Sequence, residues 1–163
     1  MSHRILSLMN IFYLDSDPVL CASMHCDKHV VKMMCEYAQL MSTAHRVLDG
    51  DSDSLYKASH VNHPSNLWVR ASIHHYIWLY RMWSALSEEY TKRYGKVHAS
   101  WNKLGTILAA APKAIPKRGW IEPPECMPGE VKLNNVRESY RNYYRIEKRK
   151  FAKWAYSSAP DWY

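Results

Sequence analysis

One short stretch of the chain concentrates side chains that often carry out catalysis. Two histidines, a carboxylate and two lysines lie within eight residues: His25, Asp27, Lys28, His29 and Lys32. Residues three and four apart share one face of a helix. A helix here is therefore expected to carry both histidines and both lysines on one polar stripe, with Asp27 pointing elsewhere. Such a stripe is either the floor of a site or a solvated helix face.

The lysines of this stretch are suited to two kinds of chemistry. A lysine beside a histidine and a carboxylate can act as a nucleophile or can anchor a phosphate. Asp27 and Glu36 are the nearest carboxylates in the sequence. The alternative is that Lys28 and Lys32 only keep the helix face solvated.

The histidines suggest a metal site, which the neighbouring charges oppose. His25 and His29 are one helical turn apart, and Cys26, His60 or His63 could complete a ligand shell. The zinc-protease signature is not present, because the first histidine is not followed by glutamate. Two lysines lie on the same stripe and would repel a divalent cation. We therefore expect no metal ion and no other cofactor.

The composition narrows the classes of partner and compartment. The 163 residues carry 22 Lys and Arg against 15 Asp and Glu, a net charge of +7, which favours polyanionic partners. Seven Trp and twelve Tyr against two Phe suit either stacking surfaces or a small helical core. Four cysteines without a CxxC pair argue against a disulfide framework and for a reducing compartment. No apolar run reaches the roughly 18 residues that a membrane-spanning helix needs.

The basic charge is concentrated near the C-terminus. Residues 132–153 contain eight Lys or Arg and two Glu, a net charge of +6. Basic residues recur every three or four positions with aromatic ones among them: Arg137, Arg141, Tyr143, Arg145, Lys148 and Trp154. Basic side chains for phosphates and aromatic ones for bases are what nucleic-acid binding needs. The alternative is a helix with an aromatic core face and a basic solvent face, but the one-sided charge favours binding.

Helices are needed to position these side chains, and the apolar spacing predicts four of them. Apolar residues three and four apart indicate helices over 18–48, 64–94, 100–111 and 131–156. Pro18 and Pro64 suit the first position of a helix, and Gly95 suits the position just after the end of one. Before the first helix, residues 10–15 are expected to form a short strand or an extended segment against the core.

Five prolines between residues 112 and 128 exclude a helix there, because proline lacks the backbone N–H and clashes with the preceding turn. Residues 112–130 are expected to form a long ordered loop. The chain is thus predicted to be all-α, a compact helical bundle that forms one domain over residues 1–163. Residues 1–8 are a candidate N-terminal extension, because Met9 is an alternative start.

Short motifs on these elements are similar to those of a known family. They are Met9-Asn10-Ile11-Phe12, Lys28-His29, Asn62-His63-Pro64, Glu89-Tyr90-Thr91-Lys92-Arg93 and Asp161-Trp162-Tyr163. The first is similar to Met-Arg-Ile-Trp at the start of bacterial members, and the second falls where the family has Arg-Glu. The third is similar to an Asn-His-Pro element that opens a long helix, and the fourth to the charged end of that helix. On these motifs the chain resembles the endonuclease V type of pyrimidine-dimer DNA glycosylase of phages and bacteria.

The resemblance implies a compact helical protein that binds duplex DNA and flips a nucleotide out of the stack. In the family the N-terminal α-amine attacks C1′ of the sugar, a Schiff base forms, and β-elimination cleaves the strand with the help of a buried Glu. Here Ser2 would supply that amine once Met1 is removed. His29 stands at the position of the catalytic Glu, so His29 itself, Asp27 or Glu36 is the candidate acid–base group.

These observations predict a DNA glycosylase/AP lyase that acts on a damaged or modified pyrimidine through a Schiff base. The predicted catalytic residues are Ser2, Asp27, Lys28 and His29. The predicted DNA contacts are His25, Lys32, Asn62, His63, Arg70, Arg137, Arg141, Tyr143, Arg145, Lys148 and Trp154. Two alternatives are a non-catalytic DNA-binding protein on the same scaffold and a phage enzyme of modified-base metabolism. The expected partner is double-stranded DNA, with no membrane, and the expected state is a monomer in the cytoplasm, that of the host if a phage encodes it.

Overall fold

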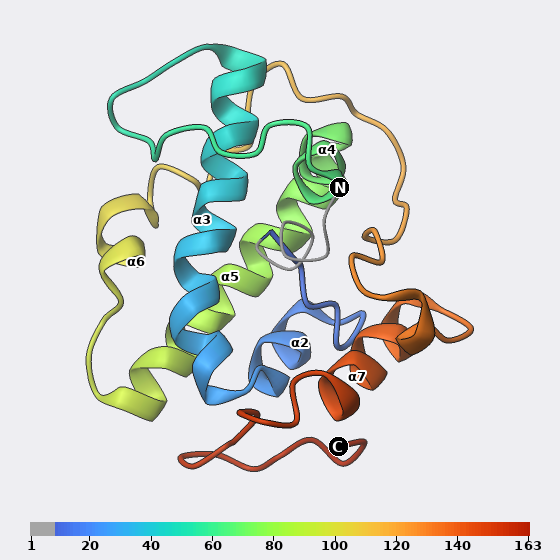
Figure 1. The fold of residues 1–163 in the computed structure, drawn as a ribbon. Coiled ribbons are helices and arrows are strands. Elements are labelled where there is room, and N and C mark those ends of the chain that lie inside the picture. The colour runs from blue at the N-terminus through green and yellow to red at the C-terminus, as the bar shows by residue number, and fades with distance from the viewer. Residues whose placement is uncertain (1–8) are drawn as a thin grey trace.

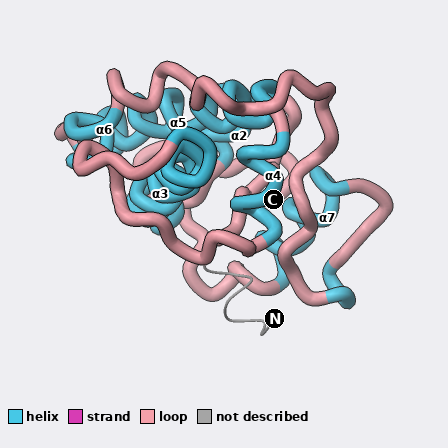
Figure 2. The backbone as a smooth tube through the Cα atoms, turned by 90° about the horizontal axis from the view of Figure 1, so that it is seen from above, coloured by secondary structure: helices cyan, strands magenta, loops and turns pink. Residues whose placement is uncertain are grey.

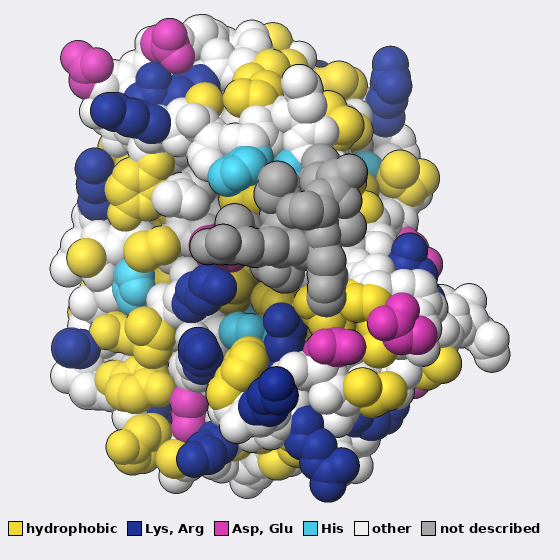
Figure 3. Space-filling view, in the orientation of Figure 1, with side chains coloured by type: hydrophobic (Ala, Val, Ile, Leu, Met, Phe, Trp, Pro, Cys, Tyr) yellow, Lys and Arg dark blue, Asp and Glu magenta, His cyan; other side chains and the backbone are white. Residues whose placement is uncertain are grey.

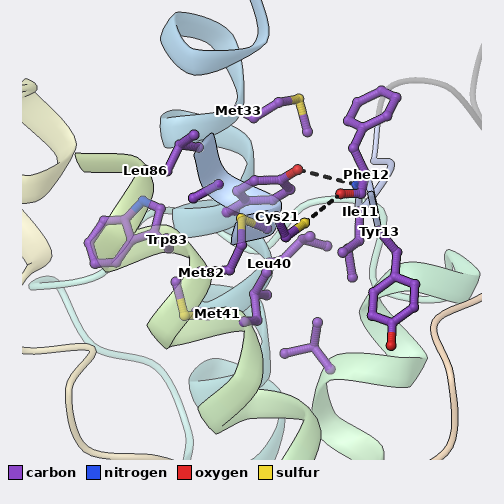
Figure 4. Close-up of a cluster of buried hydrophobic side chains, with 14 of the residues drawn as sticks. Ile11, Phe12, Tyr13, Cys21, Met33, Leu40, Met41, Met82, Trp83 and Leu86 are labelled. Carbon is purple, nitrogen blue, oxygen red and sulfur yellow. Dashed lines mark hydrogen bonds between the residues drawn. The ribbon is translucent and has the colours of Figure 1, made fainter. Parts of the chain in front are cut away.

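The chain enters the core as an extended segment. The computed structural model describes residues 9–163, in which residues 9–14 are buried without forming a strand. Asn10 uses both ends of its amide, donating to the carbonyl of Cys126 and accepting from the hydroxyl of Tyr140. Phe12 and Tyr13 project in opposite directions from this segment (Figure 4). Of the two forms expected for residues 10–15, the extended segment is the correct one.

Six α-helices and one 3-10 turn follow in the described part of the chain. They are α2 (Pro18–Met24), α3 (Asp27–Asp49), α4 (Pro64–Ala71), α5 (Ile73–Tyr94), α6 (Ala99–Leu104), η1 (Gly129–Val131) and α7 (Val136–Ile146). Residues 9–163 contain no strand, so the all-α prediction is confirmed (Figure 2). The long helices α3 and α5 pack together in the middle, and α2 packs against α5 (Figure 1). None of these helices is long and apolar enough to span a bilayer.

The core lies between α3, α5 and the extended segment. Trp83 of α5 is fully buried and donates its indole N–H to the carbonyl of Met34 in α3 at 2.8 Å. Tyr37 of α3 is fully buried as well, and its hydroxyl accepts a hydrogen bond from the backbone N–H of Phe12 (Figure 4). Burying one large apolar side chain contributes about 1.5–3 kcal/mol. These contacts fix the extended segment against α3, where the candidate site lies.

The predicted helix over 18–48 is wrong at one point, because it is two helices with a break at His25 and Cys26. His25 has an extended backbone with ψ of 133°. The backbone N–H of Asp27 donates to the carbonyl of Lys153, and the hydroxyl of Tyr144 accepts from the N–H of Cys26. These distant groups satisfy N–H groups that a continuous helix would have paired internally. The spacing of apolar residues in the sequence does not reveal these long-range hydrogen bonds.

The predicted helix over 64–94 is interrupted in the same way. Ser72 is extended, with φ of −157°, and separates α4 from α5. Its hydroxyl caps α5 by accepting from the N–H of His74 and donates to the carbonyl of Arg118. The N–H of Ile73 donates to the carbonyl of Pro116. The helix is therefore broken where the proline-rich loop crosses it.

The last two predicted helices are too long at one or both ends. The third helix ends at Leu104 and not at residue 111. Two tyrosine hydroxyls of α5 donate hydrogen bonds to backbone carbonyls after this end, Tyr80 to Gly105 and Tyr76 to Leu108. The last helix begins at Val136, after the side chain of Asn135 caps it, and ends at Ile146 instead of 156.

The proline-rich loop, residues 112–130, is held to the helices by its own backbone. Both carboxylate oxygens of Asp49, at the end of α3, accept from the N–H groups of Lys113 and Ala114. Further along, the N–H of Ile121 donates to His75, and the carbonyl of Ile121 accepts from the indole of Trp68. The loop leads the chain back to α7, which lies beside α2 and the extended segment (Figure 1).

Candidate functional site

A small pocket lies where the first turns of α3 face the end of α7 and the extended segment. It has a volume of about 90 Å³. Its lining residues are Phe12, Lys28, His29, Lys32, Met33, Lys148 and Phe151. On the same face of the molecule, Lys and Arg side chains gather around a histidine over the lower part of α3 and α7 (Figure 3). The pocket is therefore basic at its mouth and aromatic on its walls.

His29 forms the back of the pocket and is held on two sides. Its ring stacks on Phe12 with a centroid distance of 4.2 Å, and its Nδ1 lies 2.6 Å from the hydroxyl of Tyr144. Burial lowers the pKa of His29 well below its usual value, and the charges of nearby cations lower it further. The imidazole is thus neutral at physiological pH. When Tyr144 donates to Nδ1, Nε2 carries the proton and can donate to a ligand.

Three lysines reach this neutral histidine from two directions. Lys28 and Lys32 come from α3, and Lys148 comes from the turn after α7. The ammonium of Lys28 lies 4.4 Å from the centroid of the Phe151 ring, and that of Lys148 lies 4.6 Å from the centroid of Tyr143. Three positive charges that face one pocket favour an anionic ligand, such as a phosphate group.

Glu36 is a carboxylate that pairs with one of the pocket lysines, although it is not part of the pocket lining. It follows Lys32 by one turn of α3, and its Oε1 lies 3.8 Å from the ammonium of Lys32. Its Oε2 is buried and accepts no hydrogen bond within residues 9–163. Burial raises the pKa of Glu36 to about 7, although the charges of Lys32 and Lys148 oppose the rise. A carboxyl with this pKa can give and take a proton near neutral pH.

Asp27 and His25 lie away from the pocket lining. The carboxylate of Asp27 accepts from the guanidinium of Arg93 at 3.1 Å and from the N–H of Ala155 at 2.8 Å. His25 precedes α3, is fully buried, and bonds the carbonyl of Cys21 and the hydroxyl of Tyr37. The predicted stripe is therefore wrong for His25 and correct in bringing Lys28, His29 and Lys32 together.

The three residues predicted for the rim lie around the start of α4. Asn62 is exposed, and His63 caps α4 by accepting from the N–H of Ser65. Arg70 donates to the carbonyl of Val61 at 2.7 Å. None of the three lines the lysine pocket. Their contact with DNA stays a prediction.

The basic residues of the last helix divide into those with structural partners and one that lines the pocket. Arg141 pairs with Asp15, and Arg145 donates to the carbonyl of Trp162. The remaining members of the predicted set also have structural contacts: Arg137 pairs with Glu138, Tyr143 is buried, and Trp154 donates to the carbonyl of Met24. Lys148 is the member that reaches the pocket. Ser2, the predicted source of the N-terminal amine, lies outside the described residues.

Sequence reasoning missed the aromatic walls of the pocket. Phe12 and Phe151 are the only two phenylalanines of the chain, beside twelve tyrosines, and both line it. Their rarity is a signal that could have drawn attention to them. Nothing in the spacing could have paired them, because they stand near opposite ends of the sequence.

Other features of the described residues offer less chemistry. A hollow of about 470 Å³ between α2 and α5 is more open and contains Arg81 as its one basic residue. Residues 9–163 contain no cluster of three or more side chains that could hold a metal ion. The lysine pocket is therefore the candidate site.

The comparison with known protein families identifies one family. The family model described as pyrimidine dimer DNA glycosylase matches residues 9–103, more than half of the chain. The chain belongs to this family, and the resemblance inferred from the motifs is confirmed. The searches of curated proteins and of solved structures each found no match. The matched region contains α3 with its two pocket lysines but ends before Lys148 and Phe151.

Proposed function

We propose that this protein is a DNA glycosylase/AP lyase that acts on a damaged or modified pyrimidine in double-stranded DNA through a Schiff base. Membership of the pyrimidine dimer DNA glycosylase family supports this proposal. The observation that carries it is the pocket lined by three lysines, one of which, Lys32, pairs at 3.8 Å with Glu36, a carboxyl whose pKa is raised to about 7. A Schiff-base reaction needs an amine and a group that both gives and takes a proton.

The reaction follows from these groups. A neutral amine adds to C1′ as the bond from C1′ to the base breaks, and the base leaves with the electron pair and takes the proton that the amine gives up. Protonated Glu36 gives its proton to O4′ as the C1′–O4′ bond breaks, which leaves a protonated Schiff base. The Glu36 carboxylate then takes a proton from C2′, a C2′–C3′ double bond forms, and the 3′ phosphate leaves with the electrons of its bond. Water hydrolyses the Schiff base and frees the amine.

The remaining groups of the pocket bind and orient the DNA in this scheme. Lys28 and Lys32 contact phosphates on either side of the reacting sugar, which makes the affinity for DNA fall with rising salt. His29 is neutral and donates a hydrogen bond from Nε2, because Tyr144 occupies its other nitrogen. A base that is already damaged costs less to extrude from the stack, since its pairing and stacking are weaker.

The test is to trap the intermediate with borohydride. Purified protein is mixed with ultraviolet-irradiated duplex and sodium borohydride, with the same duplex before irradiation as the control. The expected result is a covalent protein–DNA adduct and strand cleavage on the irradiated duplex alone. DNA binding without any adduct or cleavage would refute the proposed activity.

A second candidate is a DNA-binding protein that has lost the chemistry. The observation that favours it is His29, a neutral imidazole at the position that corresponds to the catalytic Glu of the family. This candidate predicts salt-sensitive binding with equal affinity for irradiated and intact duplex, and no product. The borohydride experiment and a binding titration on the two duplexes distinguish it from the glycosylase.

A further inference from the structure

The proline-rich loop presents apolar and basic side chains to solvent at one place. Ile121 is 63% exposed, more than any other large hydrophobic side chain of residues 9–163, and Trp120 beside it is 39% exposed. Arg118 is exposed as well, and residues 111–121 contain no Asp or Glu. Exposed apolar side chains that gather at one place indicate a binding surface, whereas scattered ones need no explanation.

A hollow lies between these side chains and the α4–α5 junction. Its volume is about 350 Å³, and it is lined by Ala71, Ser72, His75 and residues 118–121. Binding pockets for small molecules have volumes of about 300–1,000 Å³. Burial lowers the pKa of His75, so this ring is neutral at physiological pH and Arg118 supplies the positive charge of the lining. The hollow is therefore suited to a flat ligand with a neighbouring negative charge.

The backbone of the loop is held in place around this hollow. The hydroxyl of Ser72 donates to the carbonyl of Arg118 at 2.6 Å. The N–H of Ile121 donates to Nε2 of His75 at 3.0 Å, and the carbonyl of Ile121 accepts from the indole of Trp68 at 2.9 Å. These bonds fix both ends of residues 118–121. A ligand that binds there orders little of the chain, which favours affinity.

The ring of Trp120 is placed to stack on a ligand. Its centroid lies 5.5 Å from that of Trp68 and 5.4 Å from that of His75, which support the exposed indole from the protein side. Its N–H donates to no group in the described part of the chain. Five other tryptophans do donate to protein atoms, namely Trp68, Trp78, Trp83, Trp154 and Trp162. The ring of Trp120 and its donor thus remain available to a ligand.

The hollow is separate from the lysine pocket. Phe12 lines that pocket, whereas Tyr13 projects in the opposite direction and its ring lies 6.3 Å from that of Trp120, between centroids (Figure 4). The extended segment therefore lies between the two sites. The region that matches the family model ends at residue 103, before the loop begins.

We propose that this hollow binds an unpaired base of single-stranded DNA, which stacks on Trp120 while the guanidinium of Arg118 contacts an adjacent phosphate. Every base has an aromatic face, so such a site accepts any sequence. The cation, the absence of carboxylates from residues 111–121 and the net charge of +7 favour a nucleic acid over a protein partner. The inference goes beyond the proposed function, because it adds a second binding site and involves no step of the glycosylase reaction.

The first test locates the base on the full-length protein. An oligothymidylate that carries one 5-iodouracil is mixed with the protein and irradiated with near-ultraviolet light, which breaks the carbon–iodine bond and joins the base to an aromatic ring stacked on it. Digestion and mass spectrometry identify the modified residue. We expect the modification on Trp120. A crosslink confined to Phe12 or Phe151 would place the base in the lysine pocket and overturn the inference.

The second test measures affinity for a labelled oligothymidylate by fluorescence anisotropy. Trp120→Ala should weaken binding at least about tenfold, and Trp120→Phe, which keeps an aromatic face, by less than about threefold. Tyr156→Ala, at a tail residue that is 62% exposed, is the control and should bind as the wild type does. Affinity of Trp120→Ala for intact duplex should change by less than about threefold, because paired bases cannot enter the hollow.

The role of Arg118 is tested by the salt dependence of the same binding. Arg118→Ala should make the slope of log affinity against log salt concentration shallower by about 1. Lys117→Ala is the matched control, because Lys117 is exposed but does not line the hollow. Equal slopes for the wild type and Arg118→Ala would remove the phosphate contact from the proposal.

The outcomes separate this inference from the proposed function. Full affinity of Trp120→Ala for the oligothymidylate, or no binding by the wild type, overturns the base site and leaves the glycosylase/lyase proposal in place. Failure of the borohydride experiment, with crosslinking to Trp120 intact, overturns the proposed chemistry and leaves the base site in place. A circular dichroism melt of Trp120→Ala checks that its loss of affinity does not come from unfolding.

Discussion

Two charged regions lie on either side of the first turn of α3, and they differ in whether their cations are paired with acceptors inside the protein. On one side, Asp27 faces the guanidinium of Arg93, whose side chain is fully buried. The donors of Arg93 bond Asp27, Glu89 and two backbone carbonyls of the α2–α3 junction, those of Ser23 and His25. On the other side, three lysines face one pocket, and Glu36 is the one carboxylate paired with any of them in the described chain.

The difference between the two regions indicates which charges hold the fold and which are available to a ligand. A buried guanidinium with four of its five N–H donors bonded inside the protein has little left to offer to DNA, and its loss leaves buried acceptors unpaired. Lysines without partners keep their charge for a ligand but contribute little to stability. Substitutions in the Arg93 cluster, which comprises Arg93, Asp27 and Glu89, should therefore affect stability. Substitutions in the pocket should affect activity and binding.

The largest effect is expected from Arg93→Ala. Removing one partner of a buried, hydrogen-bonded ion pair destabilises a protein by about 3–5 kcal/mol, and here two carboxylates and two carbonyls lose their donor. Urea unfolding followed by circular dichroism measures the loss. Arg81→Ala, at an exposed position of the same helix, is the control and should change stability by less than about 0.5 kcal/mol. Equal effects of the two substitutions would remove the proposed contrast between the two regions.

His25, which adjoins the Arg93 cluster, should make stability depend on pH. Burial lowers its pKa from 6.5 to about 4, so the folded state favours the neutral ring. The stabilisation is fully present above pH 6.5 and is lost as pH falls toward 4, where the unfolded chain binds a proton that the folded chain does not. The loss attributable to His25 is about 3 kcal/mol.

The measurement compares the free energy of unfolding of the wild type and His25→Gln at pH 7 and at pH 4.5. The other histidines titrate in both proteins and cancel in the difference. The variant should lose less stability between the two pH values than the wild type. Parallel pH curves would show that His25 is not the group responsible.

Glu36→Gln should separate activity from stability. Loss of the group that transfers protons lowers turnover on irradiated duplex by at least about 100-fold. Because burial raises the pKa of Glu36 to about 7, the carboxylate destabilises the folded state above that pH, and the stability associated with this group is lost as pH rises through 7. The glutamine variant should therefore melt no lower than the wild type at pH 8. Turnover within about threefold of the wild type would exclude Glu36 from the reaction.

The smallest effect is expected from Lys28→Ala. Lys28 is exposed and forms no ion pair in the described chain, so the melting temperature should hardly change. If its ammonium contacts one phosphate, the slope of log affinity against log salt concentration becomes shallower by about 1. Fluorescence anisotropy with a labelled duplex at several salt concentrations measures the slope. An unchanged slope, with Lys117→Ala as the reference, would place Lys28 away from the DNA.

The sequence predicts the parts of the fold that depend on local interactions. Pro18 and Pro64 begin helices as expected, and Gly95, with φ of 71°, follows the end of α5 in the left-handed conformation. The breaks at His25 and Ser72 depend on groups from residues 116–118 and 144–153, which bond the chain at those points. The periodicity of apolar residues does not depend on these distant hydrogen-bond partners, so it predicts two continuous helices.

The site shows the same division. Lys28, His29 and Lys32 share a helix face, and their spacing is enough to bring them together. Lys148 reaches them only because the proline-rich loop returns the chain to α3, and its sequence context predicted a phosphate contact on a continuous helix. The sequence made Glu36 a candidate acid–base residue, but it did not show that the side chain is buried. The elevated pKa of Glu36 depends on that burial.

The hydrogen bond between His29 and Tyr144 joins residues 115 positions apart in the sequence. Contacts between such distant residues form late in folding, because the entropy of closing a long loop must be overcome first. On the ribosome α3 emerges long before α7, so the nascent chain displays its first two pocket lysines without Lys148 and Phe151, which the C-terminal segment supplies. The complete pocket should therefore form only after the last part of the chain has been synthesised.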